Sequence, residues 1–349
     1  LVVSEGALWT RQRRRLAHSF IPKFVDAFAP LIEERAEAFF VDKKGVRAVD
    51  DDFMELTLNL VLDLLFGSIP ADSTNVVKES FEEISRFFAS SAEFFIQLPL
   101  WVPTPGNLRF KSAMSKMDRI VEELIQSNTE QGSQPNLLSR ILESEEMTPI
   151  DEQLLYDEIR TLMLAGHETT SLALTFSLWF LSEDLDLQER LYLELEEESI
   201  QPAAAMCSKS IEQVVRESLR ILPPVPIVTR EALQEDVVLD YKIPAGTTLI
   251  LCPFRTHNDP RWFAEPHKFK PERWTEELLE HLPRFAYYPF GGGPRVCIGM
   301  RMAMMEATII LSVIVRRFVV SRVPESKLDL QPSITLRTKS PLKLVFTPR

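Results

Sequence analysis

Hydrophobic residues recur at three- and four-residue spacing through the first two thirds of the chain, which predicts a series of amphipathic helices. The helices expected from this spacing cover residues 30–40, 53–66, 80–95, 108–131, 151–181 and 209–222. Glycine and proline interrupt the pattern at residues 67–70 and 99–107, where we expect turns or loops. Thr148 and Pro149 precede the longest predicted helix, as is typical of a helix start.

After Pro223 and Pro224 the pattern changes to short β-branched stretches bounded by proline and glycine, which predicts strands. The expected strands are residues 225–232, 237–241, 247–252, 334–336 and 342–346, the last two forming a final hairpin. Helical spacing returns at residues 297–318. The predicted fold class is therefore mainly α with small β-sheets, as a single domain over residues 1–349.

Composition excludes several classes of protein. The longest uncharged helical stretch, residues 169–182, has 14 residues, whereas about 20 are needed to cross a membrane. The formal net charge of −12 argues against nucleic acid as a partner. The three cysteines lie far apart and indicate neither a disulfide framework nor a CxxC metal site. Such cysteine usage favours a cytoplasmic or membrane-associated protein that faces a reducing compartment.

Glycine is scarce and unevenly placed. The chain has 11 glycines, and four of them lie between Gly291 and Gly299, in a window that also holds Cys297. A backbone that turns tightly before a helix directs its amide groups back at the turn, where they stabilise a thiolate, which is an anionic sulfur ligand for a metal. The alternatives are an inert packed cysteine or a phosphate-binding loop, although the Lys-Ser/Thr ending of such a loop is absent.

Residues 290–299 contain the complete pattern FxxGxRxCxG. This pattern resembles the haem-binding loop of the cytochrome P-450 superfamily, the haem-thiolate monooxygenases. The resemblance implies that Cys297 is the axial ligand of a haem b iron, with the thiolate favouring O–O cleavage. It also implies that Arg295 pairs with a haem propionate and that Phe290 packs beneath the cysteine.

Glu217 and Arg220 lie three residues apart on one helix face and resemble the family's ExxR motif. On its own such a pair is usually a solvated ion pair. Its usual partner follows in Lys270-Pro271-Glu272-Arg273-Trp274, so Arg273 is expected to complete a buried Glu-Arg-Arg network that holds the cysteine loop. Trp274 stands where the family often has Phe, which we interpret as a minor departure.

The segment Ala165-Gly166-His167-Glu168-Thr169-Thr170 lies in the middle of the longest predicted helix. A threonine hydroxyl there can compete for the carbonyl oxygen of Ala165, four residues back, and open the helix. The alternative is that the segment is an ordinary helix that tolerates one glycine. The segment resembles the family's oxygen-binding groove, which implies that Glu168 and Thr169 relay protons to dioxygen. By the same resemblance, His167 stands at a variable position and is expected to belong to the surroundings of the groove and not to be a ligand. Thr170 is expected to be a packing neighbour.

Residues 9–15 form a basic run that resembles the family's C-helix, in which Trp9 and Arg13, one turn apart, bind a haem propionate. Arg230 resembles a further propionate partner. The remaining Arg11, Arg14 and Arg15 are expected to face outward and, with Arg301, to dock an acidic electron donor. Without the resemblance, such a run is usually a solvated face.

The resemblance extends over residues 1–349, but the family's first helices and strands are missing, so we expect an N-terminally truncated chain whose membrane association would depend on the missing part. Residues 196–210 are also short for the family. The expected architecture is a helical bundle enclosing haem, with a minor β-rich region. Its apolar pocket is expected to be lined by Leu162, Ala165, Val225, Ile227, Val228 and Pro341. Residues 81–95 form either its lid or ordinary core.

The function implied by the resemblance is monooxygenation of a lipophilic substrate, with O₂ as co-substrate. A fatty acid, terpenoid or carotenoid is the first guess. Electrons come from NAD(P)H through a separate reductase or ferredoxin, since no flavin or iron–sulfur segment is recognisable. Two alternatives stay open: a haem-thiolate isomerase or peroxygenase that needs no electron donor, and a non-catalytic haem-binding fragment.

Overall fold

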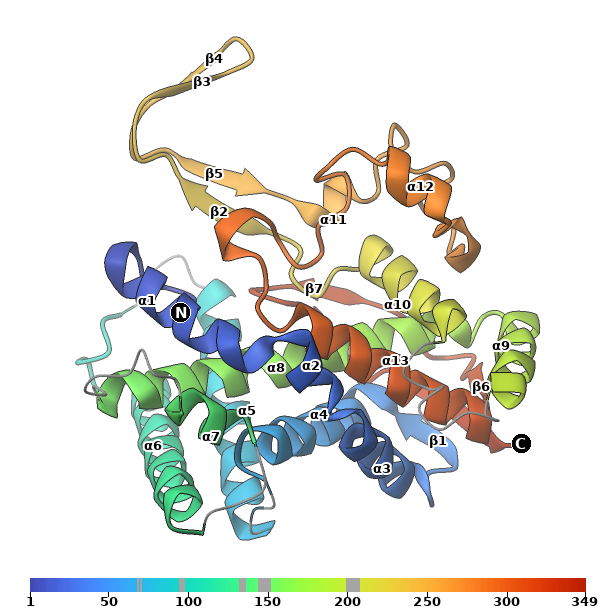
Figure 1. The fold of residues 1–349 in the computed structure, drawn as a ribbon, viewed down its shortest axis with the longest axis horizontal. Coiled ribbons are helices and arrows are strands. Elements are labelled where there is room, and N and C mark those ends of the chain that lie inside the picture. Colours follow the sequence, from blue (N-terminus) through green and yellow to red (C-terminus); the bar gives the residue numbers. More distant parts are fainter. Residues whose placement is uncertain (68, 70, 94–97, 132–135, 144–151, 199–207) are drawn as a thin grey trace. The chain divides into compact units, whose positions relative to one another are not determined.

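The computed structural model describes residues 1–67, 69, 71–93, 98–131, 136–143, 152–198 and 208–349 (Figure 1). Two compact units divide the chain. The first comprises residues 1–43, 50–171 and 298–313, and the second comprises residues 44–49, 172–297 and 314–349. Each unit is described below by itself. The expectation of one domain over the whole chain stays a prediction.

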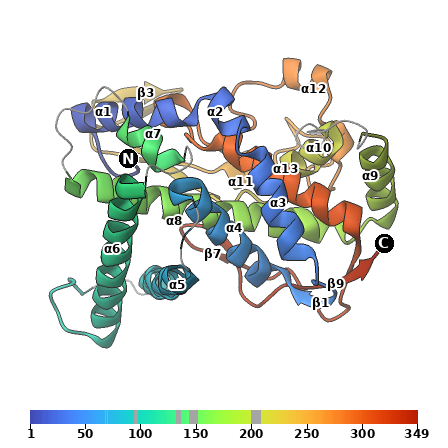
Figure 2. The ribbon, with the colours of Figure 1, turned by 60° about the horizontal axis from the view of Figure 1, so that its bottom comes forward.

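The first unit is built from helices. They are α1 (Gly6–Ala17), α2 (Pro22–Asp26), α3 (Ala29–Phe40), α4 (Val49–Phe66), α5 (Ala71–Glu93), α6 (Pro105–Gln131), α7 (Leu137–Leu142), the first part of α8 (Glu152–Leu181) and most of α13 (Met300–Arg317). Helices α5 and α6 pack against each other (Figure 2). Buried leucines of α4, such as Leu60 and Leu62, and buried residues of α8, such as Met163, belong to the core of this unit.

Helices α4 and α8 approach closely at one point. A Cβ atom placed on Gly166 of α8 would lie 3.2 Å from Cγ2 of Val61 on α4, so glycine is the residue that fits this contact without adjustment. The Thr57 hydroxyl of α4 donates a hydrogen bond to the carbonyl oxygen of His167, at 2.9 Å. This packing fixes the middle of α8, where the sequence places the predicted oxygen-binding groove.

In its described residues, the second unit combines short helices with four small antiparallel sheets. Its helices are the end of α8, α9 (Leu185–Glu198), α10 (Lys209–Ile221), α11 (Pro253–Thr256) and α12 (Glu276–His281). Its strands are β1 (Gly45–Ala48), β2 (Val228–Glu231), β3 (Asp236–Val238), β4 (Tyr241–Ile243), β5 (Thr248–Leu251), β6 (Phe318–Arg322), β7 (Leu330–Pro332), β8 (Leu336–Thr338) and β9 (Lys343–Pro348). Strand β9 is the middle of the order β1-β9-β6, and the other sheets are the pairs β2-β5, β3-β4 and β7-β8.

An apolar cluster in the second unit joins the end of α8 to the end of α10 and to β8. Its buried members are Leu172, Phe176, Ile221, Leu222 and Leu336. Phe180 and Phe269 pack against this cluster with their rings stacked, the centroids 4.7 Å apart. The end of α10 is therefore anchored in the core, and α10 is the helix that carries the predicted ExxR pair.

The helices predicted from the hydrophobic spacing are confirmed as α3, α4, α5, α6, α8, α10 and α13, with ends within a few residues except for α5, which begins nine residues earlier. The predicted start signal of α8 at Thr148 and Pro149 lies outside the described residues. Helices α7 and α9 were not predicted.

Two strand predictions are wrong. The expected hairpin of residues 334–336 with 342–346 does not form, because β8 pairs with β7, whereas β9 pairs with β1 and β6. Residues 237–241 are not one strand: they turn at Leu239 and Asp240 and contribute to both β3 and β4. Among the described residues, no helix is both long and apolar enough to cross a membrane.

Candidate functional site

The loop of residues 290–297 has a backbone that only glycine adopts without strain at two positions. Gly291 and Gly293 have φ angles of +71° and +70°, in the left-handed region. Gly292 between them is extended, and a Cβ atom there would lie 2.3 Å from the Phe285 ring. The glycine-rich composition of the window is thus explained by backbone conformation at two residues and by a close side chain at the third.

Hydrogen bonds close this loop. The Cys297 amide donates to the carbonyl oxygen of Phe290 at 2.9 Å, and the Gly291 amide donates to that of Tyr288, also at 2.9 Å. Cys297 is exposed and makes no disulfide. It lies three residues before α13, whose first turn includes the bond from the Ala303 amide to the carbonyl oxygen of Gly299.

The loop fits a haem by the chemistry of its donors and by the space around it. Cysteine is usually among the most buried residue types, yet Cys297 presents its thiol at the surface of its unit. Cβ atoms placed on Gly291 and Gly293 would meet no protein atom within 4 Å. A cysteine ligand that is exposed, beside a backbone that is open at Gly291 and Gly293, fits an iron-bearing macrocycle.

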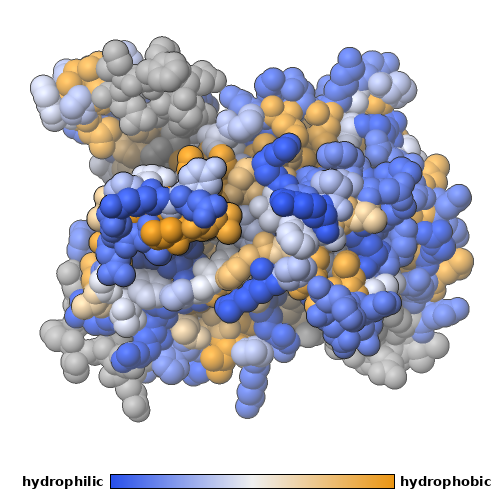
Figure 3. Space-filling model, turned by 90° about the horizontal axis from the view of Figure 1, so that it is seen from above, coloured by the Kyte–Doolittle hydropathy of each residue, from blue (hydrophilic) through white to orange (hydrophobic). Residues whose placement is uncertain are grey.

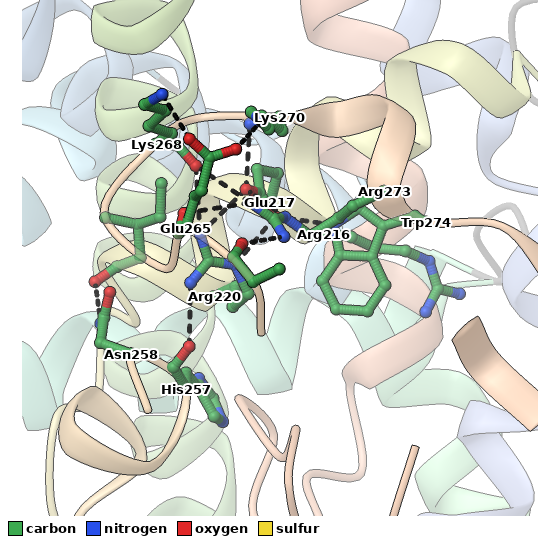
Figure 4. Close-up of polar contacts among 12 residues, drawn as sticks. Arg216, Glu217, Arg220, His257, Asn258, Glu265, Lys268, Lys270, Arg273 and Trp274 are labelled. Carbon is green, nitrogen blue, oxygen red and sulfur yellow. Dashed lines mark hydrogen bonds and ion pairs between the residues drawn. The ribbon is translucent and has the colours of Figure 1, made fainter. Parts of the chain in front are cut away.

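Glu217 of α10 accepts hydrogen bonds from both predicted arginines (Figure 4). The Arg220 guanidinium donates through Nε and Nη2 to the two carboxylate oxygens, each at 2.9 Å, and Arg273 donates through Nε at 2.9 Å. Glu217 and Arg220 are completely buried. The structure therefore brings together the three residues of the predicted Glu-Arg-Arg network.

Trp274 is part of the same network, which the sequence analysis missed. Its indole Nε1 donates to Oε2 of Glu217 at 3.1 Å, and the Lys270 amide donates to Oε1 at 3.0 Å. The signal was available in the sequence, because a buried tryptophan needs an acceptor for its N–H group and phenylalanine does not. The presence of Trp274 where the family often has Phe, which we interpreted as minor, thus supplies a further hydrogen-bond donor to the buried Glu217 carboxylate.

The middle of α8 shows the predicted side-chain hydrogen bond. The Thr169 hydroxyl donates to the carbonyl oxygen of Ala165 at 2.8 Å, as expected from its position four residues on. Glu168 and Thr169 are both half-buried. His167 is buried, with Nδ1 3.1 Å from the carbonyl oxygen of Met163 and its ring 4.5 Å from that of Phe81. Thr170 is buried, as expected of a packing neighbour.

The basic run forms α1, as the resemblance implied, with Trp9 and Arg13 half-buried and Arg11 and Arg14 exposed. The expectation that Arg15 faces outward is wrong, because it is buried on the inner side of α1. Its charge acts on Glu158 of α8, which is completely buried. Burial raises the pKa of Glu158, and Arg15 opposes that shift.

The predicted docking residue Arg301 is paired. Its guanidinium donates through Nε and Nη2 to the two carboxylate oxygens of Asp26, both at 2.7 Å, on the exposed surface of the first unit. The bonds from Arg301 lower the pKa of Asp26. An arginine already matched by a carboxylate adds little net positive charge to a docking surface. Of the four arginines predicted for docking, Arg11 and Arg14 are therefore the two that are exposed and lack this match to Asp26.

The predicted pocket residues are divided between the units. On α8, Leu162 is half-buried and Ala165 exposed, and in the second unit Val225 and Val228 are half-buried and Ile227 and Pro341 exposed. Viewed from the side of β3 and β4, hydrophobic side chains reach the surface between hydrophilic ones (Figure 3). Phe81 of the predicted lid is buried core, and Phe94 and Phe95 lie outside the described residues.

The residues predicted around the haem also fall into the two units. Phe290, Arg295, Cys297 and Arg230 belong to the second unit, where Arg230 lies on β2 and donates to the carbonyl oxygen of Thr229 at 2.8 Å. Trp9 and Arg13, and the pair Glu168 and Thr169, belong to the first unit. The structure thus describes the two predicted sides of the site separately.

Comparison with known proteins identifies the family. The family model described as cytochrome P-450 matches residues 1–346. Cyclooctatin synthase of Streptomyces melanosporofaciens is 27% identical, over 100% of this chain and 78% of its own length. Cytochrome P-450 4V2 of Homo sapiens is 26% identical, over 97% of this chain and 71% of its own length.

Solved structures share the fold. The retinoic acid-bound cyanobacterial CYP120A1 superposes with a TM-score of 0.87 at 24% identity, covering 99% of this chain and 80% of that one. A mutant cytochrome P-450 haem domain gives the same TM-score over 98% of this chain and 77% of its own. Because the family match spans nearly the whole sequence, the chain belongs to the cytochrome P-450 family of haem b-dependent monooxygenases.

Proposed function

We propose that this monooxygenase acts on a lipophilic substrate of the fatty acid, terpenoid or carotenoid class, with Cys297 as the axial thiolate ligand of its haem. Electrons come from NAD(P)H through a separate reductase or ferredoxin. The observation that carries the proposal is the loop of residues 290–297, whose two left-handed glycines and closing hydrogen bonds present an exposed thiol just before α13. Haem, when bound there, supplies dioxygen binding and activation.

The role proposed for Cys297 follows from its surroundings. Cys297 follows a tight turn and precedes a helix, and amide groups directed at a sulfur in such a place favour the thiolate over the thiol. Phe290, tied to Cys297 through the backbone, packs beneath it. Arg295 and Arg230 in the second unit, and Trp9 and Arg13 in the first, bind the haem propionates.

Glu168 and Thr169 supply protons. In the structure the Thr169 hydroxyl uses its proton in the bond to Ala165, which leaves its oxygen lone pairs available to accept a hydrogen bond from a water or from protonated Glu168. Both side chains are half-buried, so they are reachable by water without being fully solvated. Thr169 therefore positions a water by accepting its hydrogen bond, and Glu168 passes protons from solvent to that water.

The exposed apolar residues support a lipophilic substrate. Ala165 on α8 and Ile227 and Pro341 in the second unit are predicted pocket residues that reach the surface of their units. Apolar surface is stabilised by about 25 cal/mol for each Å² removed from water, so these positions favour an apolar ligand over a charged one. Binding is tested by titrating fatty acids, retinoic acid and carotenoids and recording the shift of the ferric haem spectrum.

Turnover with ¹⁸O₂, NADPH and a surrogate reductase tests the reaction. We expect one labelled oxygen atom in the organic product and the other in water, with no product when the reductant is omitted. Product formed without reductant would instead indicate an isomerase or a peroxide-dependent enzyme. Haem binding with no turnover of any ligand that shifts the spectrum would indicate a non-catalytic haem protein.

A further inference from the structure

His257 follows α11 and lies between the buried Glu217 network and the loop that carries Cys297. We propose that His257 is a positioning residue that connects these two parts of the second unit and holds the cysteine loop in its ligating conformation. This inference rests on the proposed role of Cys297. It assigns to the side chain of His257 a task that neither the ExxR motif nor the cysteine motif contains.

The backbone of His257 is fixed by the network. Arg220 donates from Nη1 to the carbonyl oxygen of His257 at 2.9 Å, while its Nε and Nη2 donate to Glu217 (Figure 4). Arg220 and His257 are both completely buried. The carbonyl oxygen of His257 therefore cannot shift without disturbing a buried ion pair.

The ring of His257 reaches in the other direction, toward the cysteine loop. Its Nε2 accepts a hydrogen bond from the Tyr288 amide at 2.8 Å. Among the described residues its Nδ1 has no hydrogen-bond partner, and the backbone of Leu219 and Arg220 at the end of α10 acts on the imidazole. The proton of the neutral ring therefore lies on Nδ1, because Nε2 needs its lone pair to accept the hydrogen bond from the Tyr288 amide.

The surroundings also keep this ring neutral. Burial lowers the pKa of His257 to about 3, and the charge of Arg220 acts in the same direction. The rings of Tyr287 and Tyr288 flank the imidazole, with centroid distances of 5.1 and 5.2 Å. A neutral imidazole held by neighbours on several sides is a fixed acceptor across the physiological pH range.

Two further hydrogen bonds lead from Tyr288 to the proposed iron ligand. The carbonyl oxygen of Tyr288 accepts from the Gly291 amide, and that of Phe290 accepts from the Cys297 amide, both at 2.9 Å. Gly291 is left-handed, so the chain reverses between these bonds. The bond from the Tyr288 amide to His257 thus ties the backbone at the start of this loop to the buried core.

Substitution of His257 separates hydrogen bonding from packing. His257→Leu removes the acceptor and leaves the Tyr288 amide without a partner. His257→Gln places an amide oxygen near the position of Nε2, whereas His257→Asn is polar but too short to reach it. Thr256→Val is the matched control, because it removes the 3.2 Å contact from Thr256 to the Tyr288 phenol and leaves the Tyr288 amide bonded.

Two measurements on each variant test the proposal. In the haem-loaded protein, we expect the red-shifted Soret band of the reduced carbon monoxide complex to fall at least twofold in His257→Leu and His257→Asn and to be retained in His257→Gln and Thr256→Val. In the haem-free protein, we expect hydrogen exchange of the Tyr288, Gly291 and Cys297 amides to accelerate at least tenfold in the Leu and Asn variants only.

Wild-type band intensity and exchange rates in both His257→Leu and His257→Asn would overturn the proposal. If His257→Leu fails to fold, the Asn and Gln variants decide, since both are polar and differ in reach. Equal behaviour of these two would also overturn it. If the wild type itself shows no red-shifted band, the proposed role of Cys297 fails, and amide exchange still reports whether His257 holds the loop.

Discussion

Val61 of α4 lies against the backbone of Gly166 in α8. This contact determines how the substitution Gly166→Ala would change stability. Glycine in a helix interior costs about 1 kcal/mol relative to alanine. A Cβ atom 3.2 Å from Cγ2 of Val61 would, however, require the valine to move. Overpacking of this kind lowers the free energy of unfolding by roughly 1–3 kcal/mol. The close contact, and not a break in α8, is therefore the physical role of this glycine.

We expect Gly166→Ala to destabilise the protein by roughly 1 kcal/mol, and Val61→Ala to relieve that loss when the two are combined. Urea unfolding of the two single variants and the double variant measures the coupling free energy between the two positions. A stabilising Gly166→Ala, additive with Val61→Ala, would show that α4 and α8 are not tightly packed at this point.

Glu306 of α13 makes the free energy of unfolding depend on pH. Burial raises its pKa to about 8, well above the ordinary value of 4.5. Between these values the folded state keeps a proton that the unfolded state has lost, so stability is full below pH 4.5 and falls as the pH rises toward 8. His257 has the opposite sign: its lowered pKa makes stability fall as the pH drops from 6.5 toward 3.

Because the two effects oppose each other, the wild type is compared with Glu306→Gln at each pH. We expect the stability of the wild type relative to this variant to fall by roughly 3 kcal/mol between pH 5 and pH 8. Chemical unfolding at three pH values in this range measures the difference. A constant difference would mean that Glu306 is ionised in the folded protein.

Single residues were predictable from sequence where the cause is local. The Thr169 hydroxyl bonds to Ala165 because both lie on one helix, four residues apart. Arg15 was misplaced because its burial depends on Glu158, which is distant in the sequence. Trp274 was undervalued for the same reason, since its acceptor Glu217 lies on another element.

At the scale of elements, helices were predicted better than strand pairing. The spacing of hydrophobic residues encodes which face of a helix is buried, but it does not encode the partner of a strand. Strand β9 pairs with β1, which precedes it by almost the whole chain. The turn between β3 and β4 was missed because Leu239, with a φ of +55°, stands where hairpin turns favour Asn or Gly.

One buried carboxylate, that of Glu217, joins α10 to residues 270–274. We therefore expect stability to depend more on Glu217 than on its neighbours in the helix. Glu217→Gln leaves two guanidinium groups without a counter-charge, which costs about 3–5 kcal/mol in buried pairs. Trp274→Phe removes one donor to a charged acceptor, which costs about 1.5–3 kcal/mol.

Thermal unfolding and haem retention of these two variants should therefore follow the order wild type, Trp274→Phe, Glu217→Gln, from most to least stable. Arg216→Ala, which removes a partly exposed pair with Glu212 on the same helix, is the control and should change stability by less than about 1 kcal/mol. A Glu217→Gln variant as stable as Trp274→Phe would show that the network is not held by charge.

At the scale of the whole molecule, we propose that surface charge directs the docking of an acidic electron donor. The chain carries a net charge of −12, so an acidic donor is repelled except where positive charge is concentrated. We propose that the exposed side of α1, with Arg11 and Arg14, is such a place in the first unit. Arg301 adds little because Asp26 neutralises it.

We expect the double variant of Arg11→Ala and Arg14→Ala to slow reduction by an acidic ferredoxin several-fold at low salt and to lose most of the salt dependence of that rate. Stopped-flow reduction at several ionic strengths measures this. Lys327→Ala, which removes an exposed charge in the second unit, should leave the rate unchanged. An unchanged rate in the arginine variant would place the donor elsewhere.

The fold class and the family were predictable from the sequence because the motifs are short and lie within single loops or helices. The relative placement of the residues was not, since Cys297 and the pair Glu168 and Thr169 belong to different compact units. What the sequence could not provide was the set of connections between motifs, such as His257 between Arg220 and Tyr288.

The proposed role of Cys297 as the thiolate ligand of the haem can be read from the spectrum of the reduced carbon monoxide complex. We expect a strongly red-shifted Soret band in the wild type, its loss in Cys297→Ser, and its retention in Cys252→Ser, the other described cysteine outside a disulfide. A red-shifted band that persists in Cys297→Ser, or that is absent from the haem-loaded wild type, would contradict it.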